Sequence, residues 1–181
     1  SLIREVSGLI SVTIPKSIEI NFQLADSLPL VRGGSAQIRQ VLMNLITNAV
    51  DAIGDDPGQI IISTGVGLPG TRNDGCACVQ HGDIVGRTVH VTVSDNGAGM
   101  ASETLSKIFD PFFTTKGMNR KQYKRGHQGS GLGMSIVYNI VTQQLMGNIS
   151  VESKENVGSK FIISFPRYHI LLNSYQNGDR Q

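Results

Sequence analysis

The segment Gly129 to Val137, GSGLGMSIV, places three glycines at alternate positions and continues as an apolar helical pattern. Backbone N–H groups in such a loop, together with a helix N-terminus, attract anions, so the segment is a candidate phosphate-binding loop. It lacks the Gly-Lys-Ser/Thr ending of a Walker A loop, and its spacing and late position do not fit a dinucleotide-binding fingerprint. Alone, the loop is weak evidence and does not identify the phosphate carrier.

Three polar residues share one face of a predicted long helix: Asn44, Asn48 and Asp51 are spaced four and three residues apart. A solvated helix face is the ordinary explanation. However, two asparagines four residues apart lower helix propensity without a structural gain. An amide oxygen is also a suitable ligand for Mg²⁺, which prefers oxygen donors and retains substrate phosphates. The stripe is therefore compatible with a solvated face or with a Mg²⁺–phosphate site.

Two further segments each allow two interpretations. DNGAGM, from Asp95 to Met100, follows a valine-rich segment and is compatible with a simple turn at a strand end. Its carboxylate is also suited to accept a hydrogen bond from an exocyclic amine such as adenine N6, while the glycines let the backbone approach a flat base. IFDPFFTTK, residues 108–116, carries three phenylalanines and ends in two hydroxyls and a cation. By itself it is compatible with core plus surface.

The composition is that of one ordinary globular domain, with 181 residues, 39% of them hydrophobic and 17% charged. A net charge of +2 gives no argument for a nucleic-acid partner. No apolar run has the length of a membrane span, and the N-terminus has no signal-peptide pattern. Cys76, Cys78 and nearby His81 fall short of a four-ligand zinc site, so we expect reduced thiols in a cytosolic protein.

Hydrophobic periodicity predicts the elements that position these residues. Strands are expected over 18–24, 59–64 and 87–94, with a closing hairpin in which NISVES and KFIISF are joined across ENVG. A long helix is expected from an N-cap at Ser35 to Ile53, and Gly54 and Pro57 end this helix. Further helices are expected over 2–14, over 101–107 and after the glycine loop. Residues 65–86 are expected to form an irregular connection, and the chain from Tyr168 a tail. The order predicts an α+β fold, a two-layer sandwich of a mixed, mostly antiparallel sheet with helices on one face.

In their order and spacing, four segments resemble the motifs of the catalytic, ATP-binding domain of sensor histidine kinases. QVLMNLITNAVDAI resembles the N box, DNGAGM the first glycine box, IFDPFFTTK the F box and GSGLG the second glycine box. That family shares its fold, the Bergerat ATP-binding fold, with gyrase B, the MutL repair proteins and the heat-shock chaperone ATPases. The resemblance implies a catalytic domain over 15–166, preceded by a remnant of a helical region over 1–14 and followed by a tail over 167–181.

The resemblance also implies a site for ATP and Mg²⁺. Asn48 would ligate Mg²⁺, Asn44 would lie beside the phosphates, and Asp95 would accept the adenine N6 hydrogen bond. The other implied contacts are Gly97 and Gly99 at the base, Ser159 where relatives often have a Thr near adenine, Thr114, Thr115 and Lys116 at the start of a lid, and Gly131, Leu132 and Gly133 at the phosphates. Asn44, Asn48 and Lys116 are the catalytic candidates.

Two departures from the family pattern refine the expected function. Gyrase-like and chaperone members carry a Glu at the position of Asn44, where it acts as general base on water. An amide cannot take that proton, which favours phosphoryl transfer to a protein nucleophile over ATP hydrolysis. Many histidine kinases carry a basic residue and an aromatic where this chain has Asp51 and Ala52. Together with TTK, this resembles the nitrogen-regulator subgroup, in which Lys116 would supply the missing charge and Asp51 would remain near the ATP.

The acceptor histidine of that family is expected on another domain, because none of the four histidines lies in a His-Glu/Asp helical motif. The expected partners are the dimerisation domain of the same kinase and, indirectly, a response regulator. The domain is expected to be monomeric and cytoplasmic, within a homodimeric parent that could be membrane-anchored. An ATP-driven switch of the gyrase or chaperone type and a non-catalytic nucleotide sensor are the alternatives. The basic stretch 116–128 is expected to be a lid, with a plain surface loop as its alternative.

Overall fold

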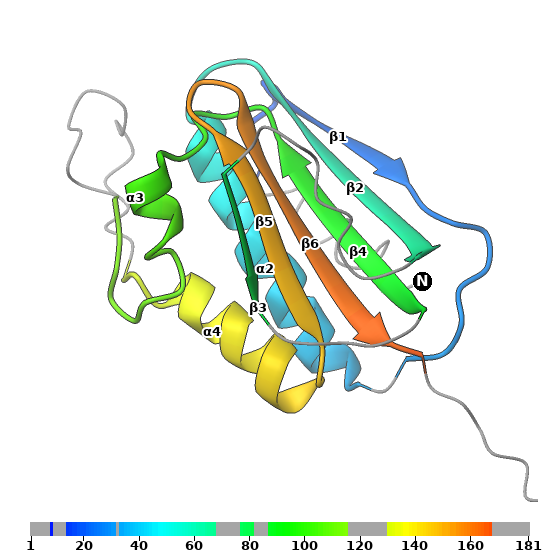
Figure 1. Ribbon diagram of the computed structural model, residues 1–181. Helices are drawn as coiled ribbons and strands as arrows, with labels where there is room; N and C mark the ends of the chain where they lie inside the picture. The colour runs from blue at the N-terminus through cyan, green and yellow to red at the C-terminus, as the bar shows by residue number, and fades with distance from the viewer. Residues whose placement is uncertain are drawn as a thin grey trace, which may run out of the picture.

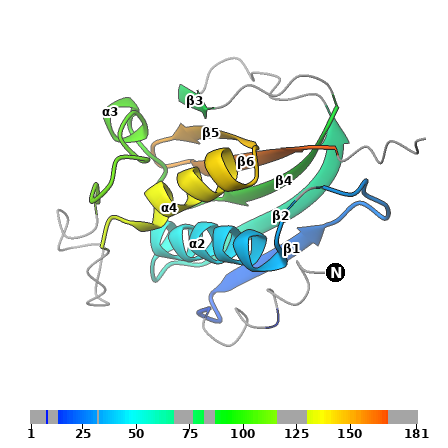
Figure 2. The same ribbon diagram turned by 90° about the horizontal axis from the view of Figure 1, so that it is seen from below.

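The computed structural model describes residue 8 and residues 14–31, 33–67, 77–81, 87–115 and 130–167. Several predictions therefore lie outside the described residues: most of the helix over 2–14, the tail from Tyr168, the basic stretch 116–128 with Lys116, and the side chains of the cysteines and His81. Within the described ranges, the chain forms one six-stranded sheet with helices on one face (Figures 1 and 2).

The strand order in the sheet is β1-β2-β4-β6-β5-β3. The first two strands, β1 (Ile18–Gln23) and β2 (Gly58–Gly67), pair in parallel, whereas every other neighbouring pair is antiparallel. The remaining strands are β3 (Ala77–His81), β4 (Thr88–Asp95), β5 (Asn148–Lys154) and β6 (Gly158–Pro166). The predicted α+β sandwich with a mixed, mostly antiparallel sheet is confirmed.

The predicted strands over 18–24, 59–64 and 87–94 and the closing hairpin are all present. The prediction of an irregular connection over 65–86 is wrong in two places. β2 continues to Gly67, where its pairing with β4 brings Gly65 opposite His90. β3 adds to the edge of β5, with Ala77 opposite Ser153. The end of β2 and the strand β3 have weak local propensity for strand structure. They form because a neighbouring strand pairs with their backbone groups.

The long helix α2 (Ser35–Ile53) buries one apolar stripe against the sheet. The buried residues of this stripe are Val41, Leu42, Leu45, Ile46, Ala49 and Ile53. The helix ends as predicted, with the Gly54 N–H donating to the Val50 carbonyl at 2.9 Å. The predicted N-cap at Ser35 is wrong, because Ser35 is already helical and the extended Gly34 precedes it. There the Gln37 side chain accepts the Gly34 N–H at 3.0 Å, which supplies the cap from inside the helix.

Two further helices are present where helical patterns are predicted. α3 (Ser102–Leu105) is a single short turn, and α4 (Gly133–Asn139) follows the glycine loop. A π-helical turn, η1 (Ile140–Gln144), continues α4 and ends with the Leu145 N–H donating to the Ile140 carbonyl at 2.9 Å. Figure 2 shows α2 and α4 side by side beneath the sheet. Together they bury the core against β4, β5 and β6.

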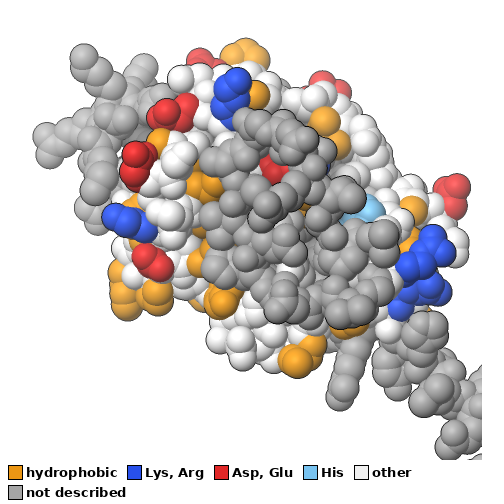
Figure 3. Space-filling view, viewed as in Figure 1, with side chains coloured by type: hydrophobic (Ala, Val, Ile, Leu, Met, Phe, Trp, Pro, Cys, Tyr) orange, Lys and Arg blue, Asp and Glu red, His pale blue; other side chains and the backbone are white. Residues whose placement is uncertain are grey.

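The outer surface carries charges of both signs. On the face seen in Figure 3, the described acidic and basic side chains are interspersed around the rim. Across β5 and β6, Lys160 and Glu152 form an ion pair at 3.3 Å. Within the described ranges, no helix has the length and apolar character required to cross a membrane.

Candidate nucleotide-binding site

A cavity of about 290 Å³ opens between α2, the ends of β4 and β6, the 95–100 loop, the F-box segment and the glycine loop. Ten of the residues predicted for the site line it. They are Asn44, Asn48, Asp51, Asp95, Gly99, Thr114, Thr115, Gly131, Gly133 and Ser159. Because the lining runs from Asn44 to Phe161, segments that are distant in the sequence meet around one space. Gly97 and Leu132 are described but are not among the lining residues, and Lys116 lies outside the described ranges.

The α2 side of the cavity carries the polar stripe Asn44, Asn48 and Asp51. The Nδ2 atom of Asn44 is buried, and within the described part of the chain it has no hydrogen-bond partner. A buried donor without a partner costs about 1–3 kcal/mol, and such groups are uncommon in folded proteins. An oxygen-rich anion in the cavity would provide the missing acceptor, so this side of the cavity fits a phosphate.

The opposite end is organised around Asp95, the last residue of β4. Burial raises the pKa of its carboxyl to about 6, against the opposing effect of hydrogen bonds from the backbone N–H groups of Gly97 and Ser159. The Gly97 N–H donates to Asp95 Oδ1 at 2.9 Å. These bonds fix the orientation of the carboxylate and leave it as an acceptor at the cavity wall. An exocyclic amine of a purine base fits that position.

The 95–100 loop is packed against its neighbours through the backbone. A Cβ on Gly97 would lie 2.5 Å from the carbonyl carbon of Ala52, and the Ala98 N–H donates to the Ala52 carbonyl at 2.9 Å. Gly99 has φ 63°, and a Cβ there would collide with the Lys154 carbonyl oxygen. Gly97 thus holds the loop against the end of α2, whereas Gly99 contributes to the cavity wall itself.

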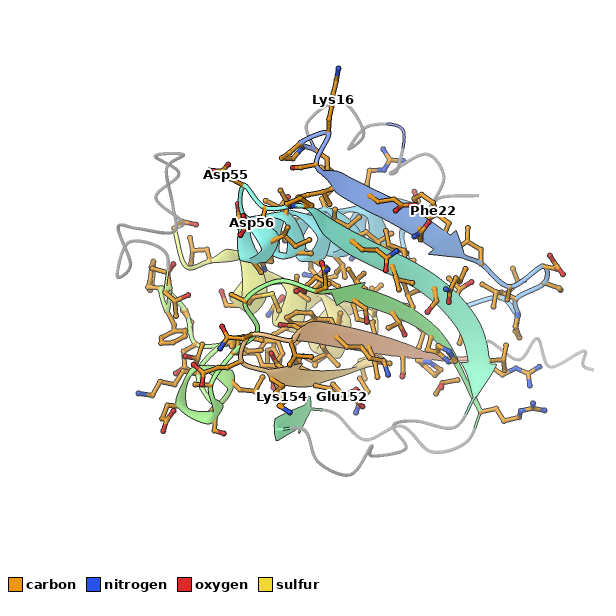
Figure 4. All side chains as sticks on the ribbon, turned by 90° about the horizontal axis from the view of Figure 1, so that it is seen from above. Lys16, Phe22, Asp55, Asp56, Glu152 and Lys154 are labelled. Carbon is orange, nitrogen blue, oxygen red and sulfur yellow. The ribbon has the colours of Figure 1, made fainter. Side chains whose placement is uncertain are left out.

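Ser153 supports the cavity wall from behind, and the sequence pattern did not predict it. It is 3% exposed and belongs to β5, the strand whose residues Glu152 and Lys154 are labelled in Figure 4. Its Oγ accepts the Met100 N–H at 2.9 Å and lies 3.0 Å from the Oγ of Ser159. The sequence did contain one indication of this role: Ser153 lies two residues after the buried Val151, so its hydroxyl is on the buried face of the strand.

The glycine loop is joined directly to the F-box segment. Gly131 has φ 68°, and a Cβ there would lie 2.5 Å from the carbonyl carbon of Phe112. The Phe112 N–H donates to the Gly131 carbonyl at 3.0 Å. Leu132 precedes α4, and its N–H donates to Ser130 Oγ at 3.4 Å. Gly133, in contrast, has space, since a Cβ there would lie 3.7 Å from Asn44 Oδ1.

The donor set limits which metal the cavity fits. Among the side chains that the structure describes, no group of three or more His, Cys, Asp and Glu could hold a metal ion alone. The amide oxygen of Asn48 and the carboxylate of Asp51 are hard oxygen donors on adjacent turns of α2. Such a pair fits Mg²⁺ only when phosphate oxygens and water complete the coordination, which is the usual arrangement for this ion at nucleotide sites.

Comparison with known proteins identifies the family. Residues 33–169 match the family model described as Histidine kinase-, DNA gyrase B-, and HSP90-like ATPase. The sensor histidine kinase ZraS of Escherichia coli is 33% identical over 157 residues, which cover 83% of this chain and 26% of ZraS. The histidine kinase/phosphatase NtrB of Rhizobium leguminosarum is 30% identical over 92% of this chain and 39% of NtrB. The chain thus spans well under half the length of these relatives.

Similar solved structures are also histidine kinases. The catalytic domain of histidine kinase ThkA superposes with a TM-score of 0.65 at 33% sequence identity, covering 92% of both chains. The structure of ThkA in complex with the response regulator protein TrrA superposes with a TM-score of 0.60 at 30% identity, covering 92% of this chain and 40% of that one. The chain therefore belongs to the histidine kinase-, DNA gyrase B- and HSP90-like ATPase family, as an ATP-binding catalytic domain of the sensor histidine kinase type.

Proposed function

We propose that this domain binds Mg-ATP in the cavity and donates the γ-phosphoryl group to a histidine on a separate dimerisation domain of the same kinase. A response regulator would then take the phosphoryl group in a two-component signalling relay. The observation that carries the proposal is Asn44, whose buried Nδ2 has no partner among the described residues and whose side chain lines the cavity.

The chemistry of Asn44 favours transfer over hydrolysis. A water molecule attacking the γ-phosphate must lose a proton to a base, and an amide has no basic site for it near neutral pH. The same amide can donate its N–H to a phosphate oxygen and so fix the position of the triphosphate. Phosphoryl transfer depends mainly on such positioning and on charge stabilisation, so a nucleophile supplied from outside the domain would complete the reaction.

The remaining roles follow the two ends of the cavity. We propose that Asp95 accepts the adenine amine, with Ser159 beside it and Gly97 and Gly99 holding the loop close to the base. At the other end, the Asn48 amide oxygen would ligate Mg²⁺, with Asp51 near the same ion. Thr114, Thr115 and Lys116 on one side and Gly131, Leu132 and Gly133 on the other would contact the phosphates. Bound Mg²⁺ would neutralise charge on the phosphate oxygens.

The proposed partners belong to the parent protein. One similar structure is that of ThkA in complex with a response regulator protein, which supports such a regulator as the final acceptor here. We propose a homodimeric parent, a catalytic domain that is monomeric in isolation, a cytoplasmic location, and no nucleic-acid partner. His90 lies on β4, outside the cavity lining, and burial followed by the charge of Lys160 lowers its pKa. We therefore do not propose His90 as the phosphoryl acceptor.

The test supplies a separate helical domain bearing the acceptor histidine, together with Mg²⁺ and ATP labelled at the γ-phosphate. Acid-labile label on the added histidine is the expected result. Release of free phosphate instead would favour the gyrase-type or chaperone-type switch, and ATP binding with neither outcome would favour a nucleotide sensor. The chain alone should remain unlabelled, and label on one of its own histidines would contradict the proposal. Asp95→Asn is the control that weakens nucleotide binding.

A further inference from the structure

A pair of serine hydroxyls lies beneath the Asp95 end of the cavity, which is called the base end after its proposed ligand. Ser153, 3% exposed on β5, and Ser159, 7% exposed on β6, are directly opposite each other in the sheet. The Oγ of Ser153 makes three polar contacts: the Met100 N–H at 2.9 Å, the Gly158 carbonyl oxygen at 3.1 Å and the Ser159 Oγ at 3.0 Å. Only Ser159 of the two lines the cavity.

The number of available hydrogens decides the direction of these bonds. Each hydroxyl has one hydrogen to donate, and the Met100 N–H brings its own. The contact with the Gly158 carbonyl requires the Ser153 hydrogen, because a carbonyl oxygen can only accept. The contact between the two hydroxyls therefore requires the Ser159 hydrogen. Any other assignment would place two acceptors against each other inside a buried site, which is unfavourable.

Ser159 consequently offers only lone pairs to the cavity. Its neighbour in the next strand is Asp95, which is paired with it across β4 and β6 and lines the same wall. The backbone N–H groups of Gly97 and Ser159 are already directed at the Asp95 carboxylate. Both side chains at this wall are thus hydrogen-bond acceptors. The exocyclic amine of a 6-amino purine has two hydrogens and can donate to both, whereas a 6-oxo purine has a carbonyl acceptor at that position and the ring N1–H as its one donor beside it.

We propose that Ser153 is a positioning residue that fixes Ser159 as an acceptor and thereby makes the base end prefer 6-amino over 6-oxo purine nucleotides. The inference rests on the proposed nucleotide function of the cavity. It assigns the selectivity to a residue that does not itself contact the cavity. Without the Ser153 Oγ, the Ser159 hydroxyl is free to rotate and donate its hydrogen to a ligand carbonyl.

The experiment measures the affinity of the domain for ADP and for inosine diphosphate by calorimetry in the presence of Mg²⁺. In Ser153→Ala, the preference for ADP over inosine diphosphate should fall about tenfold, the size of effect expected for one hydrogen bond. The loss of the Met100 contact affects both nucleotides and cancels in the ratio. Ser164→Ala, which removes a hydroxyl of similar burial on β6 away from the cavity, should leave the ratio unchanged.

Ser159→Ala gives an independent test that does not require Ser153→Ala to fold. Removing an acceptor should weaken ADP and leave inosine diphosphate unchanged or tighter. The double variant should show the ratio of Ser159→Ala alone, because the effect of Ser153 acts through Ser159. An equal loss for both nucleotides in both single variants would overturn the inference. If the unmodified domain bound no ADP, the proposed function itself would fail, and the inference with it.

Discussion

The two ends of the cavity, the base end at Asp95 and the phosphate end at Asn44, are named after the ligand groups that we propose for them. They differ in how many of their polar groups are hydrogen-bonded within the folded chain. At the base end, the 95–100 loop is held by backbone contacts to α2 and to the β5–β6 hairpin, and the Asp95 carboxylate already accepts backbone N–H groups. At the phosphate end, the Nδ2 of Asn44 is buried without a described partner. A Cβ on Gly99 has no space, whereas a Cβ on Gly133 meets only ordinary contacts.

Because of this difference, we expect the two ends to contribute differently to binding: the base end selects the ligand, and the phosphate end gains a hydrogen bond from it. A base end whose donors and acceptors are fixed before binding can select a ligand with little loss of conformational entropy, which is the advantage of preorganisation. A phosphate end with an unsatisfied donor gains a hydrogen bond only when the ligand arrives. We therefore expect substitutions that displace the backbone at the base end to destabilise the fold, and side-chain substitutions there to change base binding or selectivity. Substitutions at the phosphate end should change the contribution of phosphate and metal while leaving the apo fold intact.

The largest effect is expected from Gly99→Ala compared with Gly133→Ala. The new Cβ at residue 99 would collide with the Lys154 carbonyl at a positive φ, so we expect a loss of about 3 kcal/mol in the free energy of unfolding and loss of ADP binding. At residue 133, which begins α4, the stability should stay within about 1 kcal/mol of the unmodified value. Urea unfolding of both variants measures this. Equal destabilisation would remove the contrast between the ends.

Asp95→Asn should weaken ADP binding about ten- to a hundredfold, because a charge-assisted hydrogen bond to the base is lost. The fold should be retained, since the substitution keeps the shape of the side chain and removes a charge from a buried position. Calorimetry gives the affinity, and circular dichroism gives the fold. An unchanged affinity would show that Asp95 does not contact the base.

Lowering the pH should weaken ADP binding by up to about tenfold per unit below pH 6. Burial raises the pKa of Asp95 from 3.8 to about 6, so below pH 6 the free domain carries a proton that must leave before the carboxylate can accept the amine. The same raised pKa means that the contribution of Asp95 to stability is fully present below about pH 3.8 and is lost as the pH rises through 6. Asp95→Asn is the control, and its affinity should not follow this titration.

Asn48→Ala should remove the dependence of ATP affinity on Mg²⁺. If its amide oxygen is a direct ligand, the variant binds ATP about equally with Mg²⁺ or with a chelator, and about tenfold more weakly than the unmodified domain with Mg²⁺. The affinity for adenosine, which has no phosphate, should not change. A variant that still binds ATP more tightly when Mg²⁺ is added would contradict the assignment.

Asn44→Ala should have the smallest effect on affinity, and this effect should be confined to the ligand that carries phosphates. The Nδ2 atom has no described hydrogen bond to lose, so the free energy of unfolding should remain within about 1 kcal/mol. ATP affinity should fall about fivefold, while adenosine affinity stays constant. A large loss of stability in the apo variant would show that Asn44 serves the fold and not the phosphate end.

The sequence alone determined the elements with strong periodicity and the motifs with distinctive residue types. The apolar spacing in α2 and the alternation in β4 and β6 were sufficient to predict these elements, because their buried faces repeat at 3.6 and 2 residues. The stripe of Asn44, Asn48 and Asp51 was predicted from the same helical spacing. The glycine-rich segments and Asp95 each allowed two interpretations alone, and the resemblance of four ordered motifs to the histidine kinase family selected between them.

Only the tertiary structure decided the features that depend on a distant partner. β3 forms because β5 offers an unpaired edge, and nothing in the local sequence of 77–81 required it. Gly34, and not Ser35, is the N-cap of α2, because the Gln37 side chain accepts the backbone N–H of Gly34. The role of Ser153 was invisible for the same reason: its hydroxyl acts on Met100 and Ser159, and those contacts exist only once the loop packs on the hairpin. Local pattern fixes which face of an element is buried, whereas the pairing of individual polar groups is set by the long-range packing that brings them within hydrogen-bond distance.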